Sequence, residues 1–212
     1  MGMIETWMGV LTKPVETFAT EKKNSSIMAG VKQYAIIFGI FGLLMGIEVA
    51  AMAYIMSFFP PAGNLSFIRS LGIAAIIVVP IIFIVGGIIL TLIGVGIQFL
   101  IAKLLGGTGT FEQQYYLSSL TAMPALILSI IAGIISGLFG KVPILEVIIT
   151  LLLILAIGLY LLYLQTKAIK EAHQFSTLKA FAVLFITPII VGLVMGTAIM
   201  ALIASMAVTK GY

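Results

Sequence analysis

The pattern of polar and apolar positions along this chain is dominated by five long stretches that carry almost no charge. A helix needs roughly 20 apolar residues to cross the hydrocarbon core of a bilayer, and each stretch reaches that length. The stretches cover residues 33–59 (interrupted once, by Glu48), 70–102, 113–140, 147–166 and 180–209. We therefore predict membrane spans at about 34–57, 76–101, 117–139, 145–165 and 181–206.

The fold class predicted from these stretches is all-α. Every backbone polar group must be satisfied inside the lipid, and a helix does this within one segment. We expect a polytopic integral membrane protein, in which a five-helix transmembrane bundle occupies residues 34–209.

Residues 1–33 form the one sizeable segment outside the predicted spans. Apolar residues recur there at helical spacing: Ile4, Trp7, Met8, Leu11, Val15 and Phe18. Pro14 fits the first turn of a helix, and Thr12 could cap that turn. We expect one or two short amphipathic helices in the membrane interface, with Trp7 as the interface anchor. The alternative is a frayed tail.

Composition and charge support a lipid environment. Apolar residues make up 62% of the 212 residues and charged residues 8%, which is more apolar surface than a soluble domain of this size can bury. The chain contains no cysteine, which excludes disulfides and thiolate metal sites. We assign the lysines to loops, so no nucleic-acid partner is expected.

The basic residues are distributed unevenly between the two predicted faces. One face would carry Lys13, Lys22, Lys23, Lys32, Lys103, Lys167, Lys170 and Lys179, and the other Arg69, Lys141 and Lys210. Because basic residues accumulate in cytoplasmic loops, we predict a cytoplasmic N-terminus and an external C-terminus.

Small residues recur every four positions in several spans. Such a stripe lets two helix backbones approach closely in lipid. The residues are Gly42 and Gly46, then Ala125, Ser129, Gly133 and Gly137, and finally Gly192 and Gly196. We interpret them as helix-packing positions within one bundle. A homodimer face is the alternative.

Glu48 is the one charge that interrupts the five low-charge stretches. A charged side chain is costly in hydrocarbon, and its default interpretation is functional. Arg69, after the following loop, is its nearest cationic candidate partner. Glu48 could equally reach the outer surface or pair with Arg69 for structure alone. It faces nearly opposite to Gly46 on a helix.

The inner loops hold the other candidate residues. His173, the single histidine, lies in a predicted loop with no metal-site partners nearby, and we interpret it as a loop residue without special chemistry. Residues 106–110, Gly-Gly-Thr-Gly-Thr, lack the features of a nucleotide loop. We predict a tight turn there, then a capping box that begins a helix at Phe111.

Signatures of catalysis are missing. The chain has no Asp, no Cys and no HExxH or GxSxG motif. We expect no enzyme, no cofactor and no metal site.

The inner loops also carry a family resemblance. The matching stretches are Lys13-Pro14 through Phe18, residues 102–109 with Phe111, Met123-Pro124, and residues 170–180. With five spans, the chain resembles the Yip domain family, the Ypt/Rab GTPase-interacting membrane proteins, over about residues 10–207. The resemblance implies a five-helix domain with a cytosolic N-terminus and, in eukaryotic members, a role with small GTPases in trafficking or membrane shaping.

The chain departs from the eukaryotic pattern. It lacks the long polar N-terminal region and the Asp-Leu-Tyr-Gly-Pro motif, so GTPase binding stays open. It is similar to short prokaryotic members, which suggests a prokaryotic cell membrane.

Two functions follow from the sequence. The first is a non-enzymatic membrane scaffold or trafficking-type factor that is embedded in the lipid bilayer. Residues 103–116 and 165–179 would form its surface for another membrane protein. Its candidate partner residues are Lys103, Gly106, Gly107, Phe111, Glu112, Lys170, Glu171, His173 and Lys179. The alternative is a small proton- or cation-coupled transporter or channel that uses Glu48.

Overall fold

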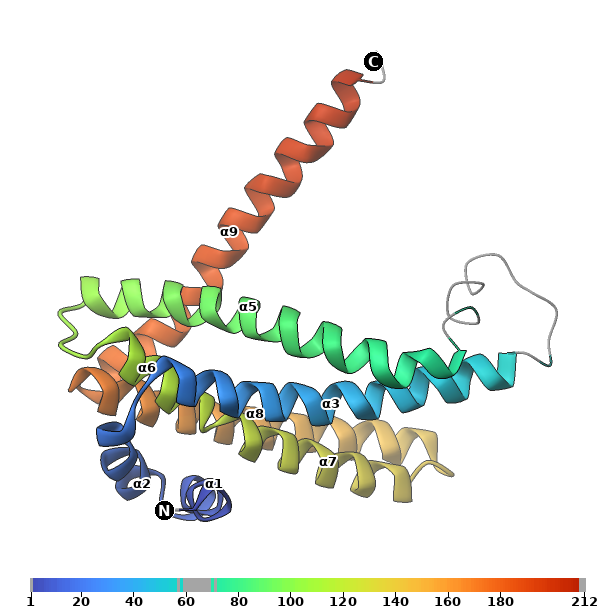
Figure 1. Ribbon diagram of the computed structural model, residues 1–212, viewed down its shortest axis with the longest axis horizontal. Coiled ribbons are helices and arrows are strands. Elements are labelled where there is room, and N and C mark those ends of the chain that lie inside the picture. The colour runs from blue at the N-terminus through green and yellow to red at the C-terminus, as the bar shows by residue number, and fades with distance from the viewer. Residues whose placement is uncertain (1, 57, 59–69, 71, 210–212) are drawn as a thin grey trace.

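The computed structural model of the chain describes residues 2–56, 58, 70 and 72–209. Its long helices are α3 (Ile27–Met56), α5 (Ala75–Leu104), α6 (Phe111–Ser119) with α7 (Ala122–Leu138), α8 (Pro143–His173) and α9 (Thr177–Thr209). Five helical segments in the described part are long and apolar enough to cross a membrane (Figure 1). The predicted all-α polytopic bundle is confirmed.

The membrane helices extend past the spans predicted from charge. α3 begins at Ile27, where the Ser26 hydroxyl accepts a bond of 3.0 Å from the Ala29 amide. α8 runs on to His173 and ends at Gln174, whose φ of 57° lies in the left-handed region. A helix of 31 residues is about 46 Å long and exceeds a hydrocarbon core of roughly 30 Å. The charged end of α8, from Lys167 on, therefore lies outside the hydrocarbon.

The third membrane segment is divided into two helices. Thr110 caps α6 by the expected capping box, in which its hydroxyl accepts from the Gln113 amide and Gln113 returns a bond to the Thr110 amide. The helix breaks at Leu120, because Pro124 lacks an amide hydrogen and its ring collides with the carbonyl four residues earlier. α7 then carries the apolar stretch.

Two short helices precede the bundle, α1 (Met3–Thr12) and α2 (Pro14–Glu21), followed by the 3-10 turn η1 (Lys22–Asn24). Pro14 stands in the first turn of α2, as predicted, but Lys13 rather than Thr12 is the N-cap. The Thr12 hydroxyl instead donates to the Met8 carbonyl at 2.8 Å, so Thr12 ends α1.

The membrane helices form two antiparallel pairs. α3 packs along α5, preceded by η3 (Gly72–Ala74), and α7 packs along α8 (Figure 1). Gly42 and Gly46 let the first pair approach closely: a Cβ added at Gly42 would lie 2.6 Å from the Pro80 Cα, and one at Gly46 2.7 Å from the Ala75 carbonyl oxygen. The Thr150 hydroxyl joins the second pair by a 2.9 Å bond to Ser136.

The four glycines of the stripes on α7 and α9 have no neighbouring helix among the described residues. A Cβ added at Gly133, Gly137, Gly192 or Gly196 would meet no described atom within 4 Å. Ala125 is half-buried, and Ser129 is exposed with its hydroxyl bonded back to the Ala125 carbonyl. The prediction of packing inside one bundle is wrong for these four glycines, because α7 turns that face outward and α9 leaves the bundle.

The last helix packs on α5 and α8 only through its first part. Val183 and Thr187 are buried, and the described side chains beyond Pro188, such as Leu193 and Met200, are mostly exposed. A proline inside a helix bends it, and Figure 1 shows α9 leaving the bundle at a steep angle.

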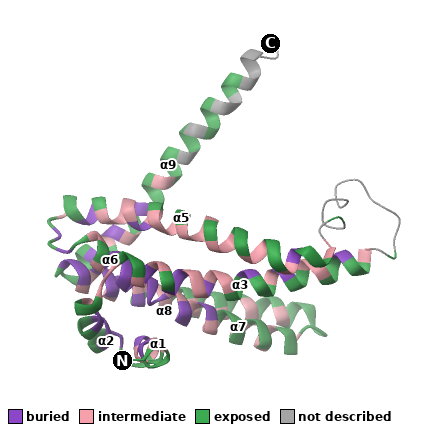
Figure 2. Ribbon diagram, viewed as in Figure 1, coloured by how far each residue is buried: buried purple, intermediate pink, exposed green. Residues whose placement is uncertain are grey.

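The buried residues are concentrated at one end of the molecule rather than in the middle of the membrane helices. Figure 2 shows the buried residues concentrated where α6, the end of α8 and the N-terminal helices meet. By contrast, only 6% of the most apolar window of α8 is buried within the chain. The spans turn most of their surface to lipid, and the packed core lies at the polar end.

Candidate functional site

The strongest candidate for a functional site is the polar end of the bundle, which we call the polar hub. It comprises α1, α2 and η1, residues 103–110, α6, and residues 164–179, which end α8 and begin α9.

Glu21, the last residue of α2, lies at its centre. Its side chain is only 4% exposed, and one carboxylate oxygen accepts a 2.7 Å bond from the Tyr116 hydroxyl of α6. The Thr6 hydroxyl and the Asn24 amide contact the carboxylate at the longer distances of 3.4 and 3.5 Å. A buried carboxylate needs such donors, so this bond fixes α2 on α6.

Two further bonds attach the N-terminal segment to α8. The Lys22 ammonium donates to the Glu171 carbonyl at 2.6 Å and lies 4.0 Å from the Glu171 carboxylate. The Tyr160 hydroxyl donates to the Leu11 carbonyl at 2.6 Å. Val10 and Phe18 are fully buried beneath these contacts, so α1 and α2 form part of the folded core.

Trp7 also faces the bundle. Its indole nitrogen donates to the Gln33 side chain of α3 at 2.8 Å, and its ring packs beside Ile37 and Met123. The structure thus places this side chain between α1, α3 and α7. Its role as a membrane-interface anchor stays a prediction.

The loop 105–110 wraps around the end of α8. The Gly107 amide donates to the Ala102 carbonyl at 2.9 Å, and both the amide and the hydroxyl of Thr108 donate to the His173 carbonyl, at 3.3 and 3.2 Å. Gly106 has φ of 87°, a conformation that L side chains rarely adopt. A Cβ added at Gly109 would collide with the Ala172 carbonyl oxygen. Glycine is therefore required here by close backbone contact.

His173 is the side chain around which this loop closes. It is 1% exposed, and its Nε2 lies 2.6 Å from the Gln114 side-chain oxygen. Its ring stacks on Phe175, with centroids 5.4 Å apart. The prediction that His173 lies in a loop is wrong, because it is the last residue of α8 and is buried beneath the loop 105–110. That it has no special chemistry stays a prediction. Burial, followed by the positive charges of Lys103 and Lys22, lowers its pKa to about 4.

Side chains with charges surround the buried part of the polar hub. Lys103, Glu112 and Lys179 are exposed, and Lys170 and Glu171 are half-buried. The Lys179 ammonium also donates to the Leu105 carbonyl at 3.0 Å. These residues form the accessible surface of the polar hub.

Three of the predicted partner residues are not part of that surface. Gly107 and His173 are buried, and Phe111 is half-buried between the rings of Phe99 and Tyr115. They support the loop and cannot offer a side chain to a partner. Gly106 is exposed, but has no side chain to offer.

Glu48 lies far from this surface in the chain and in the fold. Its side chain is exposed on α3, opposite to the buried Gly46, and it makes no ion pair or hydrogen bond with any residue that the structure describes. Arg69, its predicted partner, lies outside the described residues.

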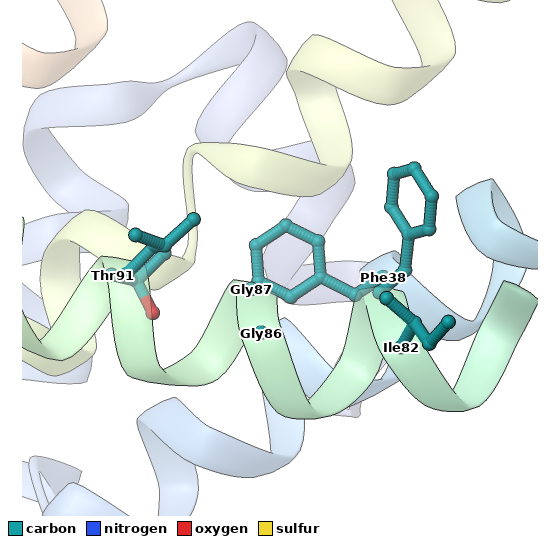
Figure 3. Close-up of a pocket in the computed structure, with 7 residues that line it drawn as sticks. Phe38, Ile82, Gly86, Gly87 and Thr91 are labelled. Carbon is teal, nitrogen blue, oxygen red and sulfur yellow. The ribbon is translucent and has the colours of Figure 1, made fainter. Parts of the chain in front are cut away.

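An apolar groove of about 440 Å³ opens between α3 and α5 (Figure 3). Phe38 lies over Gly87, where an added Cβ would sit 2.5 Å from the ring, and Ile82 and Gly86 extend the wall. Its one polar side chain, Thr91, already bonds to the Ile88 carbonyl and the Tyr115 hydroxyl. The groove thus offers no free polar group for recognising a polar substrate.

Sequence reasoning missed Glu21, Gln114 and Tyr116. Glu21 precedes two lysines, a pattern typical of a solvated segment, while its closest partner, Tyr116, lies 95 residues later. The available signal was the polar and aromatic run Gln113-Gln114-Tyr115-Tyr116 just ahead of an apolar stretch. Such a run is costly to bury unless its polar groups find partners.

Comparison with known proteins agrees with this architecture. The family model of the Yip1 domain matches residues 8–200, which includes the N-terminal helices from Met8 on, the loop 105–110 and all five membrane segments. Neither a curated protein nor a solved structure gives a significant match to the chain. The chain is a multi-pass membrane protein and belongs to the Yip1 domain family.

Proposed function

We propose that this protein is a non-enzymatic membrane scaffold that presents the polar hub to another membrane protein. The single observation that carries the proposal is the concentration of packing and hydrogen bonds at that end. The N-terminal helices, the loop 105–110 and the end of α8 form one connected core there. A rigid surface at the lipid boundary is what a docking partner requires.

The chemistry of the accessible surface suits a polar protein partner. Lys103, Lys179 and Lys170 carry positive charge, and Glu112 and Glu171 carry negative charge. Mixed charges on a preformed surface favour specific pairing and orientation. A small GTPase would bind the same surface and would form the adduct in the photo-crosslinking experiment below.

Nothing in the polar hub supports a reaction. Among the residues that the structure describes, no three His, Cys, Asp or Glu side chains come together as a metal site. The buried polar pairs Glu21–Tyr116 and His173–Gln114 are each enclosed by the fold. They support a structural role for these groups.

The transporter alternative gains no specific support from the fold. Glu48 is exposed on the outer face of α3, and the groove nearby, of about 590 Å³, is lined by Ile47, Ala51 and Tyr54 without it. A carrier would hold such a group in a polar cavity between helices. We therefore favour the scaffold.

For the orientation, we propose that the polar hub faces the cytoplasm of a prokaryotic cell. The support is the lysine distribution: Lys22, Lys103, Lys167 and Lys179 all lie at this end, which agrees with the rule that basic residues stay inside. Labelling of a cysteine introduced at Lys23 in intact cells and in inverted vesicles tests it. Labelling of this cysteine in intact cells would show that the polar hub faces the outside instead.

Site-specific photo-crosslinking tests the scaffold. A photoreactive amino acid replaces Glu112, on the accessible surface, or Leu155, which is 60% exposed on the membrane part of α8. In native membranes we expect a discrete protein adduct from position 112. The reversed variants Lys103→Glu and Lys179→Glu should reduce its yield. Equal adducts from both positions, or no effect of charge reversal, would refute docking at the polar hub.

A further inference from the structure

A second apolar groove lies where α8 and α9 diverge. It has a volume of about 300 Å³, and Leu159, Leu162 and Phe181 form its apolar walls. Tyr163 and Thr166 complete the side formed by α8, and Lys167 and Thr177 stand at its polar end. The groove therefore runs from apolar residues of the membrane part to the charged end of α8.

Two lysines stand at this polar end, one turn apart on α8. The Lys167 ammonium lies 5.1 Å from the centroid of the Tyr163 ring. The Lys170 ammonium lies 3.4 Å from the Thr177 hydroxyl. In the described part of the chain, neither forms an ion pair, because Glu171 pairs with Lys22. The pairing of Lys167 with Glu171, four residues later, that the helical spacing suggests is thus not made.

The first residue of α9 adds to this positive charge. Thr177 begins a helix of 33 residues, and the N-terminus of a helix carries a partial positive charge. Together, two unpaired ammonium groups and a helix terminus lie above an apolar groove that ends at the boundary of the lipid. A ligand that fits this arrangement has one negative charge and an apolar tail.

We propose that this groove binds an anionic phospholipid. The phosphate lies between Lys167 and Lys170, and part of one acyl chain lies along Leu159, Leu162 and Phe181. Basic pockets between membrane helices recognise anionic head groups in this way. A second copy of the chain is the competing occupant of the groove, and the dimer measurement below distinguishes it from a lipid.

The inference does not depend on the scaffold proposal. It requires only the α8–α9 groove and its lysines, and the photo-crosslinking positions lie elsewhere. Failure of either experiment leaves the other intact.

Native mass spectrometry of the purified full chain tests it. The protein is titrated in detergent with phosphatidylglycerol or with phosphatidylcholine of the same acyl chains. We expect one lipid to bind with a preference for phosphatidylglycerol. The double variant Lys167→Gln/Lys170→Gln should lose roughly 30-fold in that preference, about fivefold for each lysine near the head group.

Two control variants separate the site from its general charge. Lys23→Gln/Lys32→Gln removes the same charge from exposed positions that do not line the groove and should keep the preference. Leu159→Trp places a larger side chain in the apolar wall of the groove. The position is 59% exposed, so the fold should tolerate it, and the binding of both lipids should become weaker. A thermal unfolding curve confirms that each variant is folded.

Four results would overturn the proposal, the last of them a shift to dimers. The first is equal binding of the two lipids by the unchanged protein, and the second is equal loss in both lysine double variants. The third is displacement of the lipid by inorganic phosphate with no effect of Leu159→Trp, since that result would assign the site to a free anion. A shift to dimers on removal of lipid, blocked by Leu159→Trp, would assign the groove to a second copy.

Discussion

The bond between Glu21 and Tyr116 should hold the N-terminal helices on the bundle. In Tyr116→Phe the ring stays and only the hydroxyl is lost. A hydrogen bond to a charged group contributes roughly 1.5–3 kcal/mol. The remaining donors, Thr6 and Asn24, lie 3.4 and 3.5 Å from the carboxylate, at the limit of hydrogen bonding. They cannot replace a 2.7 Å bond.

This loss should appear as local undocking rather than global unfolding. The population of undocked α1 and α2 should rise roughly 10- to 150-fold. An isolated helix of eight residues is not stable in water, so α2 (eight residues) should lose its structure when it leaves the bundle. Hydrogen exchange of the amides from residue 15 to residue 24 should accelerate by the same factor, while α8 keeps its protection.

Tyr163→Phe is the matched control. The Tyr163 hydroxyl makes no hydrogen bond in the described part of the chain, and the side chain is 42% exposed. Exchange should stay unchanged in this variant. If the two variants exchange alike, the N-terminal helices are held by apolar packing alone, and the reasoning about Glu21 is refuted.

Three other predictions concern the loop and the membrane charge. Gly109→Ala should lower stability by about 1–3 kcal/mol in thermal unfolding, because its Cβ meets the Ala172 carbonyl, whereas Gly94→Ala, in open space, should not. The folded pKa of His173, about 4, lies below its ordinary value of 6.5. Stability should therefore be full above pH 6.5 and fall as the unfolded chain takes up the proton between pH 6.5 and 4. That fall should be absent from the melting curves of His173→Gln. In proteoliposomes that contain a pH-sensitive dye, Glu48→Gln should leave proton movement unchanged. A proton flux that depends on Glu48 would instead favour the transporter function.

The membrane helices could be predicted because the penalty for charge in lipid acts on each residue separately. A stretch free of charge is visible without knowledge of its neighbours, and the capping box at Thr110 is equally local. Helix ends were less visible, since α8 continues to His173 through charged residues that lie outside the hydrocarbon. No charge-based rule marks that point.

The polar hub could not be predicted because its contacts join distant parts of the chain. Glu21 and Tyr116 are 95 positions apart, and Lys22 and Glu171 are 149 apart. Which glutamate is buried depends on the docking of α2 on α6, and this docking has no local signature. The glycines show the same limit, because the spacing is alike at Gly42 and Gly133 but only Gly42 has a neighbouring helix against it.

The two helix pairs, α3 with α5 and α7 with α8, are joined to each other mainly at one end, the polar hub. Each pair is held along its length, by Gly42 and Gly46 in one case and by Ser136 and Thr150 in the other, while contacts between the pairs are concentrated at the polar hub. A bilayer of different thickness makes helices tilt at modest cost. We therefore expect a change of thickness to alter the angle between the two pairs at the ends away from the polar hub, while the polar hub keeps its geometry.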